Sequence, residues 1–326
     1  MNVTVVGAGA WGTALALLAH QNGHAITLWG HDPAHLAELS AAGANERYLP
    51  GIPLPRDWRP EPDLDRAAAR ADLVVLAVPS RAFRGIASRL AAFAGPVVSV
   101  TKGIERHTGL TMCGILAEAM PGAAVAALSG PSLALEVARG IPTAVVAAAL
   151  DPALARRVQD LFHRPTFRVY TSTDVAGVEL GGALKNVVAI AAGVCDGLGY
   201  GDNAKAALVT RGQAEMRRLG VACGARAETF SGLSGLGDLV VTCFSKLSRN
   251  RRLGERLGGG EPIAAILAST HSAIEGYHTA LSANELAAQR GIPAPITGEV
   301  HAMLYENKDV RRAVQDLLGR DSKAED

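Results

Sequence analysis

The residue most able to do chemistry in this sequence is a lysine inside an apolar run. From Leu180 to Val194, the only polar side chains are those of Lys185 and Asn186. Burial of an ammonium group disfavours its charged form and brings its pKa closer to neutrality, where it can donate a proton. A lysine at the edge of a helix can instead extend its ammonium group into water. Lys185 is therefore either a catalytic acid or a surface side chain, and the rest of the sequence must distinguish the two.

The composition excludes one class of function. The chain has 326 residues, 48% of them hydrophobic, which suggests about two domains that can each bury a core. Lys and Arg number 32 and Asp and Glu 31, so the net charge is +1. Proteins that bind nucleic acids usually carry a basic surplus. We therefore expect no nucleic-acid partner.

The cysteines and the N-terminal residues predict a cytoplasmic location. The four cysteines lie far apart in the sequence, so no CxxC pair for metal or redox chemistry is formed. Scattered cysteines are typical of a reducing compartment. The chain begins as a strand rather than as a signal peptide, and no apolar run is long and uninterrupted enough to predict a membrane span. We expect a cytoplasmic protein without a bound metal.

The order of the apolar segments predicts an α/β domain at residues 1–176 and a helical domain at residues 177–326. In the first, short aliphatic runs alternate with helix-like segments, which indicates parallel βαβ units. The excursion 45–65 contains five prolines and is expected to be a loop. The expected strands are Val3–Val6, Ala25–Trp29, Leu73–Val78, Val97–Val100, Ala124–Leu128 and Thr143–Ala148. The expected helices of the second domain are Val178–Val194, Ala204–Leu219, Arg249–Leu257, Ser272–Gln289 and Thr297–Glu306.

A glycine motif follows the first expected strand. The residues Gly7, Gly9 and Gly12 form the pattern GxGxxG, with Ala10 and Trp11 between the last two glycines. Such glycines permit a tight turn and a close backbone approach, and the N-terminus of the next helix attracts a pyrophosphate. Because a strand precedes the motif and a helix follows it, the motif predicts dinucleotide binding.

The end of the second expected strand bears on the choice of dinucleotide. A site selective for NAD usually has an acidic residue there, which binds the ribose hydroxyls. Here His31 follows the strand, and Asp32 is displaced and precedes Pro33, where it can cap the next helix. His31 either accepts a 2′-phosphate or is a plain surface residue. The sequence favours NADP and leaves NAD open.

A second anion site is predicted near the densest basic stretch. Ser248 is a favourable N-cap, and the backbone N–H groups of Arg249 and Asn250 would lie beside a guanidinium group, which suits a phosphate. The alternative is a capped basic helix without a ligand. Arg251 and Arg252 are expected on the solvated face of this helix.

Three further groups follow expected strands or glycine turns. Lys102 follows one strand, and Gly130 and Ser132 follow the next, which places them at the carboxyl edge of the sheet, where such folds bind ligands. Asp238 lies between a glycine-rich turn and an apolar run. It either caps a helix or orients a substrate hydroxyl.

Together these motifs closely resemble those of the bacterial NAD(P)-dependent glycerol-3-phosphate dehydrogenases, over nearly the whole chain. Several ordered motifs are more specific than any single one. The resemblance implies a Rossmann-type N-terminal domain, an all-α C-terminal domain like that of 6-phosphogluconate dehydrogenase, and a homodimer. Segments that also carry it are Leu184–Val187, Asp196–Leu208, Gly235–Leu239 and Ile274–Gly276.

The resemblance implies reversible reduction of dihydroxyacetone phosphate to sn-glycerol 3-phosphate by NADPH or NADH. Lys185 matches the family's catalytic proton donor, and Lys102 matches a lysine that touches both substrate and cofactor. The implied substrate-binding positions are Lys102, Gly130, Ser132, Lys185, Asn186, Asp238, Thr242, Ser248, Arg249 and Asn250. The implied cofactor-binding positions are Gly7, Gly9, Ala10, Trp11, Gly12, His31, Lys102, Ala134, Arg249 and Glu275.

The sequence departs from the family pattern at three positions. Ala10 stands where serine is frequent, which removes one hydroxyl contact to phosphate, and Leu133 and Leu135 replace the usual phenylalanine and lysine. Two other functions remain open. A related β-hydroxyacid dehydrogenase would need a carboxylate site in place of the phosphate site. A non-catalytic NADP sensor would not need Lys185, Lys102 and Asp238 together.

Overall fold

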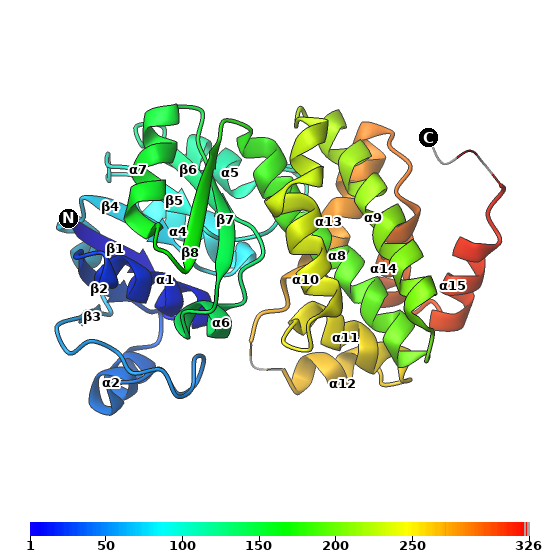
Figure 1. Ribbon diagram of the computed structural model, residues 1–326, viewed down its shortest axis with the longest axis horizontal. Helices are drawn as coiled ribbons and strands as arrows, with labels where there is room; N and C mark the ends of the chain where they lie inside the picture. Colours follow the sequence, from blue (N-terminus) through cyan, green and yellow to red (C-terminus); the bar gives the residue numbers. More distant parts are fainter. Residues whose placement is uncertain (271, 323, 325–326) are drawn as a thin grey trace.

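A sheet domain is followed by a helical domain in the computed structural model, which describes residues 1–270, 272–322 and 324. The two domains lie side by side, with the sheet domain on the left of Figure 1. The last strand ends at Ser172 and the first helix of the second domain begins at Val175, so the change from sheet to helices falls between these residues.

The sheet has eight strands in the order β3-β2-β1-β4-β5-β6-β7-β8. The strands are β1 (Asn2–Val6), β2 (Ala25–Trp29), β3 (Arg59–Glu61), β4 (Leu73–Leu76), β5 (Val97–Ser99), β6 (Val125–Ser129), β7 (Thr143–Ala148) and β8 (Phe167–Ser172). The helices between them are α1 (Ala10–Gln21), α2 (Pro33–Ala42), α3 (Leu64–Ala69), α4 (Ser80–Arg89), α5 (Met112–Ala119), α6 (Ala134–Ala138) and α7 (Pro152–Phe162). The predicted α/β domain is confirmed, because each expected strand is present within a few residues of its predicted bounds.

Two features of this domain differ from the prediction. β3 lies within the proline-rich excursion 45–65, where it pairs with the outer edge of β2. An edge strand tolerates proline because one side of its backbone needs no partner. β7 is antiparallel to β6 rather than parallel. The intervening α6 has only five residues, about 8 Å of helix, too short to carry the chain back along the sheet as a parallel crossover requires.

The helical domain is built around α8 (Val175–Gly197), which is buried from Gly177 to Cys195. By length and composition alone, this helix is long and apolar enough to cross a membrane, which differs from the prediction that no apolar run is long enough. Its most apolar window is entirely buried inside the protein. The domain continues with α9 (Asp202–Ala222), η1 (Ala227–Ser231), η2 (Leu233–Gly237), α10 (Asp238–Phe244), α11 (Arg249–Gly258), α12 (Ile263–Ala268), α13 (Glu275–Arg290), α14 (Pro295–Tyr305) and α15 (Val310–Leu318). The predicted helical domain is thereby confirmed.

Two glycines fix the separation of α8 and α11. A Cβ atom added at Gly193 would lie 1.9 Å from the carbonyl oxygen of Arg251, and one added at Gly254 would lie 1.9 Å from that of Ile190. The two helices therefore pack backbone against backbone, which side chains other than hydrogen would prevent. This contact sets the distance between the helix that carries Lys185 and the basic N-terminus of α11.

A buried carboxylate joins α8 to the sheet domain. Both oxygens of Glu179 accept from the backbone N–H of Cys113, near the N-terminus of α5, at 3.0 and 3.2 Å. Burial raises the pKa of the Glu179 carboxyl to about 7, although hydrogen bonds from Thr111 and Cys113 lower it. A carboxyl whose pKa is raised on folding makes the protein less stable as the pH rises from its unfolded to its folded pKa.

We expect Glu179→Gln to remove a pH dependence of stability. In the wild type, ionisation of Glu179 should lower the free energy of unfolding by about 3 kcal/mol between about pH 4.5 and 7. A neutral amide can still accept from Cys113, so the variant should lose that slope. Urea unfolding at pH 5 and 7.5 measures it, with the exposed Glu228→Gln as control. Equal slopes in all three proteins would contradict the assignment.

Candidate active site

Lys185 is a buried residue and not a surface side chain. Its residue exposure is 6%, and its Nζ donates to Asp238 Oδ1 at 2.8 Å and to Thr242 Oγ1 at 2.6 Å. The hydroxyl of Thr242 in turn donates to the backbone carbonyl of Asp238 at 2.6 Å, one turn earlier in α10. α8 therefore supplies the lysine, and α10 supplies the two groups that orient it.

Asp238 binds a second lysine from the other domain. Lys102 Nζ lies 2.5 Å from Asp238 Oδ2, and it also donates to the carbonyl of Gly130 at 3.1 Å. Asp238 itself is only 1% exposed. The side chain of Asp238 therefore binds two lysines and caps no helix, so the helix-cap alternative is wrong. That it orients a substrate hydroxyl stays a prediction.

The surroundings of Lys185 place its pKa near neutrality. The pKa of Lys185 is lowered to about 8: burial lowers it most, the positive charge of Lys102 also lowers it, and the Asp238 carboxylate partly offsets both by raising it. At this pKa the lysine can donate a proton as the ammonium ion and accept one as the neutral amine at ordinary pH.

The glycine motif has the shape that a dinucleotide requires. Gly7 has a φ of +127°, and a Cβ there would lie 2.5 Å from the carbonyl oxygen of Ala77. A Cβ at Gly12 would lie 2.0 Å from the Gly7 carbonyl oxygen, whereas a Cβ at Gly9 would meet nothing within 4 Å. The first and third glycines therefore serve the turn and the packing, and the second faces open space at the N-terminus of α1, where a pyrophosphate binds in such folds.

The acid after β2 is engaged within the protein. Asp32 Oδ1 accepts from the backbone N–H groups of Ala34 and His35 as the N-cap of α2, and Asp32 Oδ2 lies 3.3 Å from Arg47 Nη1. The prediction that Asp32 caps the next helix is confirmed. His31 is exposed beside it.

The predicted anion site lies at the N-terminus of α11. Ser248 is the N-cap, and its hydroxyl accepts from the N–H of Arg251 at 3.2 Å. Arg249 is exposed, and its Nη1 donates to the carbonyl of Ala273 at 2.6 Å. The N-cap role predicted for Ser248 is confirmed, whereas phosphate binding at this helix terminus stays a prediction.

Arg251 does not lie on a solvated face, contrary to expectation. It is 8% exposed, and its Nε lies 2.6 Å from Asp196 Oδ2, which also binds Lys205 Nζ at 2.8 Å. The close packing of α8 and α11 turns this side chain inwards to the end of α8. Arg252 is exposed, as predicted.

The remaining predicted residues fall at the edges of the same region. Asn250 Nδ2 donates to Asn186 Oδ1 at 2.8 Å, so these two side chains pair with each other next to Lys185. Gly130 has a φ of +141°, and its carbonyl oxygen accepts from the Ser132 hydroxyl at 2.9 Å. Ala10 and Trp11 begin α1, Ala134 begins α6, and Glu275 begins α13.

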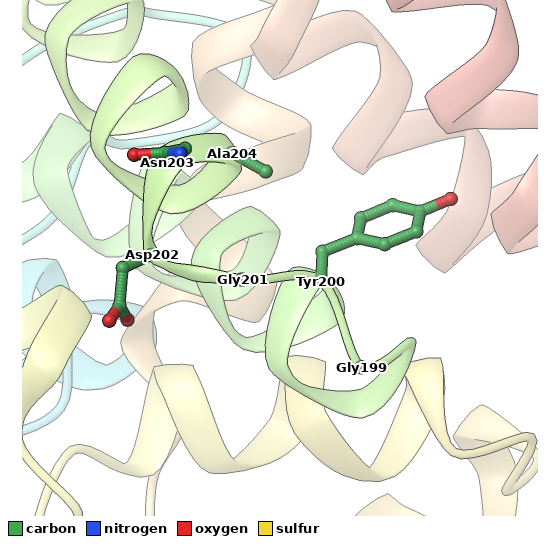
Figure 2. Close-up of a pocket in the computed structure, with 6 residues that line it drawn as sticks. All are labelled: Gly199, Tyr200, Gly201, Asp202, Asn203 and Ala204. Atoms are coloured by element: carbon green, nitrogen blue, oxygen red, sulfur yellow. The ribbon is translucent and has the colours of Figure 1, made fainter.

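A surface cavity lies away from these residues. It is lined by residues 199–204, which form the loop after α8 and the first residues of α9, and the side chains of Tyr200 and Asp202 point to opposite sides of this segment (Figure 2). The loop begins 14 residues after Lys185, about 20 Å along the helix axis. The cavity does not include the lysines, so it is not the site of the predicted chemistry.

Ser80 is a residue near the site that the sequence analysis missed. Its backbone N–H donates to Glu275 Oε1 at 3.2 Å, and its hydroxyl donates to Glu275 Oε2 at 2.5 Å. The only available signal was its position just after β4, at the carboxyl edge of the sheet, the same edge that holds the glycine motif and Lys102.

A dinucleotide-binding sheet and a helical domain that together enclose a lysine of lowered pKa define an NAD(P)-dependent oxidoreductase. Residues 2–155 match the sequence model for the N-terminal domain of NAD-dependent glycerol-3-phosphate dehydrogenase, and residues 174–315 match the model for its C-terminal domain. The chain belongs to the NAD-dependent glycerol-3-phosphate dehydrogenase family.

Similar proteins cover the chain from end to end. A glycerol-3-phosphate dehydrogenase [NAD(P)+] of Thioalkalivibrio sulfidiphilus is 50% identical over 99% of this chain and 98% of its own length. The crystal structure of a glycerol-3-phosphate dehydrogenase from Coxiella burnetii has a TM-score of 0.95 at 39% identity, over 98% of this chain and 99% of that one. A yeast glycerol-3-phosphate dehydrogenase has a TM-score of 0.83 at 27% identity, over 98% of this chain and 99% of that one.

We expect Gly9→Ala to separate cofactor binding from folding. The added methyl group meets no protein atom, so the melting temperature should stay within about 1 °C of the wild type. It would occupy the space that a pyrophosphate needs, and NADPH affinity should fall by about tenfold or more, or about 1.4 kcal/mol. NADPH titration by fluorescence measures this, with Gly85→Ala in α4 as control, because a Cβ there also meets no atom within 4 Å. Unchanged affinity would show that the loop binds no dinucleotide.

Proposed function

We propose that this protein catalyses the reversible reduction of dihydroxyacetone phosphate to sn-glycerol 3-phosphate with NADPH or NADH. The observation that carries the proposal is the buried Lys185, held by Asp238 and Thr242 beside a second lysine at the carboxyl edge of the sheet. The activity named for relatives that are 46% and 50% identical over 99–100% of this chain supports it. A non-catalytic sensor would have no use for two lysines on one buried carboxylate.

In this proposal Lys185 delivers the proton that the ketone oxygen requires. A bound nicotinamide cofactor would supply the hydride that the carbonyl carbon takes up, and negative charge would then develop on the carbonyl oxygen. The ammonium group of Lys185 gives a proton to that oxygen, and in the reverse direction the neutral amine removes it. Thr242 and Asp238 keep the lysine nitrogen in place throughout.

Lys102 stabilises the developing charge or holds a substrate hydroxyl. Its ammonium group reaches the same carboxylate from the sheet domain and is also fixed by the Gly130 carbonyl. A fixed cation next to a developing oxyanion lowers the energy of the transition state, because it needs no reorientation during the reaction.

The phosphate group is proposed to bind at the N-terminus of α11. Arg249 and the backbone N–H groups that follow Ser248 can hold a dianion there, remote from the reacting carbon. The same site argues against a β-hydroxyacid dehydrogenase, which would need to bind a carboxylate in place of a phosphate. Binding energy at a remote group fixes the orientation of the carbonyl.

The cofactor is proposed to be NADP(H), with NAD(H) as the alternative. Both oxygens of Asp32 are engaged, one by the α2 N-terminus and the other by Arg47, so this carboxylate is a poor partner for the ribose hydroxyls of NAD. His31, two residues after β2, and Arg47, which contacts Asp32, can both face a 2′-phosphate. The proposed reaction uses no metal ion.

The protein is also proposed to act in the cytoplasm as a homodimer that supplies a precursor of phospholipids. The resemblance to the family supports these proposals. An apolar stripe along η2 and α10 offers a surface that a second copy could cover, because Leu236, Val240 and Phe244 are 40–46% exposed and spaced four residues apart.

We expect the pH profile of ketone reduction to report the ionisation of Lys185. For reduction, kcat/KM should be constant below about pH 8 and fall above it, because this direction requires the protonated lysine. For oxidation of glycerol 3-phosphate, kcat/KM should rise up to about pH 8 and be constant above it, because that direction requires the neutral amine. Asp238→Asn should move the midpoint to lower pH, and Lys102→Met should move it to higher pH. Lys185→Ala should nearly abolish turnover in both directions. Normal turnover in Lys185→Ala, or identical midpoints in the other variants, would rule out this role.

We expect Arg249→Ala to weaken phosphate binding. The KM for dihydroxyacetone phosphate should rise about 10- to 100-fold, the loss expected for a charged hydrogen bond. Arg252→Ala, an exposed arginine on the same helix, should leave the KM unchanged. The phosphate site is contradicted if both variants behave alike, or if the wild type uses non-phosphorylated dihydroxyacetone equally well.

A further inference from the structure

The Ser80–Glu275 contact joins the two domains across the site. Ser80 is the first residue of α4 in the sheet domain, and Glu275 is the first residue of α13 in the helical domain. The carboxylate accepts both the backbone N–H and the hydroxyl of Ser80. A negative charge at the N-terminus of a helix is favourable, because the first N–H groups of the helix have no partner within it.

The turn that carries Ser80 touches the proposed cofactor site. Ala77, at the start of that turn, is so close to the glycine motif that a Cβ at Gly7 would lie 2.5 Å from its carbonyl oxygen. On the other side, a Cβ at Gly103 would lie 2.6 Å from Ser80 Cβ, directly after Lys102. Closely packed segments of this kind move together, because there is no free volume between them.

The start of α13 touches the proposed substrate site. Next to Glu275, the N–H of Gly276 donates to Asn250 Oδ1 at 2.9 Å, and Asn250 Nδ2 donates to Asn186 Oδ1 at 2.8 Å. Asn186 is the neighbour of Lys185 in α8. A Cβ at Gly276 would lie 2.6 Å from Asn250 Oδ1, so the start of α13 is closely packed against α11 as well.

We propose that Ser80 is a positioning residue that, through Glu275, couples occupation of the cofactor site to affinity for the substrate. The contiguous contacts run from the glycine motif through Ser80 and Glu275 to the Asn250–Asn186 pair. When the cofactor fixes the glycine motif, the Ser80–Glu275 contact holds the start of α13, and with it the asparagines beside Lys185, in the arrangement that binds substrate. The proposal rests on the proposed function, which supplies the two ligands.

Ser80 allows this coupling to be separated from direct ligand binding. Glu275 matches a cofactor-binding position of the family, so its substitution changes both the contact with Ser80 and the proposed direct contact with the cofactor. Ser80 matches no such position, and its hydroxyl is directed to Glu275. A purely structural contact between domains would affect stability or both affinities equally, whereas a coupling contact affects the affinity for one ligand only when the other is bound.

Calorimetry on the full-length protein tests the proposal. The affinity for sn-glycerol 3-phosphate is measured with and without saturating NADPH, a pair that cannot react because both are reduced. The ratio of the two dissociation constants is the coupling factor, expected in the wild type to be about fivefold or more. Ser80→Ala should bring this factor close to one while leaving the affinity for NADPH alone unchanged. Ser88→Ala, an exposed serine on the same helix, should keep the wild-type factor.

A double-mutant cycle assigns the effect to the contact. Once Glu275→Gln has weakened the contact, adding Ser80→Ala should cause little further loss of coupling. The proposal is overturned if Ser80→Ala retains the wild-type coupling factor, or if it weakens the binding of NADPH alone by as much as it lowers the coupling factor. It is also overturned if the two substitutions lower the coupling factor independently, so that their effects on it multiply. If the wild type reduces dihydroxyacetone phosphate but its coupling factor is one, the coupling is overturned and the proposed function stays intact. A wild type that binds no glycerol 3-phosphate would overturn both.

Discussion

A single buried carboxylate, Asp238, holds two ammonium groups that come from different domains. One negative charge compensates only one of the two positive charges, and the interior offers little solvation to the other. The site relieves this imbalance by lowering the pKa of Lys185, which burial and the charge of Lys102 both favour. In the proposed reaction, this makes Lys185 the group that exchanges protons near neutral pH. The same excess of positive charge suits a substrate that carries a phosphate and develops negative charge at its carbonyl oxygen.

The rest of the fold keeps these three side chains in register. The glycines of α8 and α11 bring two helix backbones together, so the lysine and the proposed phosphate site have a fixed separation. Asp196, near the end of α8, binds both Lys205 and Arg251 and so also joins α8 to α11. Glu179 and Glu275 tie the helical domain to the sheet domain on either side of the site. In the contacts of Asp196, Glu179 and Glu275, a buried or half-buried carboxylate binds a partner fixed on a helix.

Features determined by local pattern could be predicted from the sequence. The glycine motif was identifiable because strand, turn and helix residues occur in consecutive positions. Lys185 stood out because its neighbours in the chain are apolar, and burial of α8 on all sides preserved that contrast. The N-cap roles of Asp32 and Ser248 were predictable, because capping involves residues only two or three positions apart.

Features determined by distant contacts could not be predicted in the same way. The direction of β7 depends on the length of α6 and on which edge of the sheet is free. Arg251 turns inwards because a helix far away in sequence approaches it closely, while its own neighbours suggest a solvated surface. Ser80 and Glu275 are 195 positions apart, and neither has a local pattern that indicates the other. β3 was hidden by prolines, which an edge strand accommodates.

The central claim is that the Lys185 ammonium group, enclosed by Asp238, Thr242 and Lys102, exchanges protons near neutral pH. The most direct measurement is an NMR titration of the protein with ¹⁵N-labelled lysine side chains, with Lys185 assigned by its loss in Lys185→Met. The chain has only six lysines, so the signals can be resolved. The account predicts a midpoint for Lys185 at about pH 8. A midpoint at or above the ordinary value for lysine, about 10.4, would contradict it.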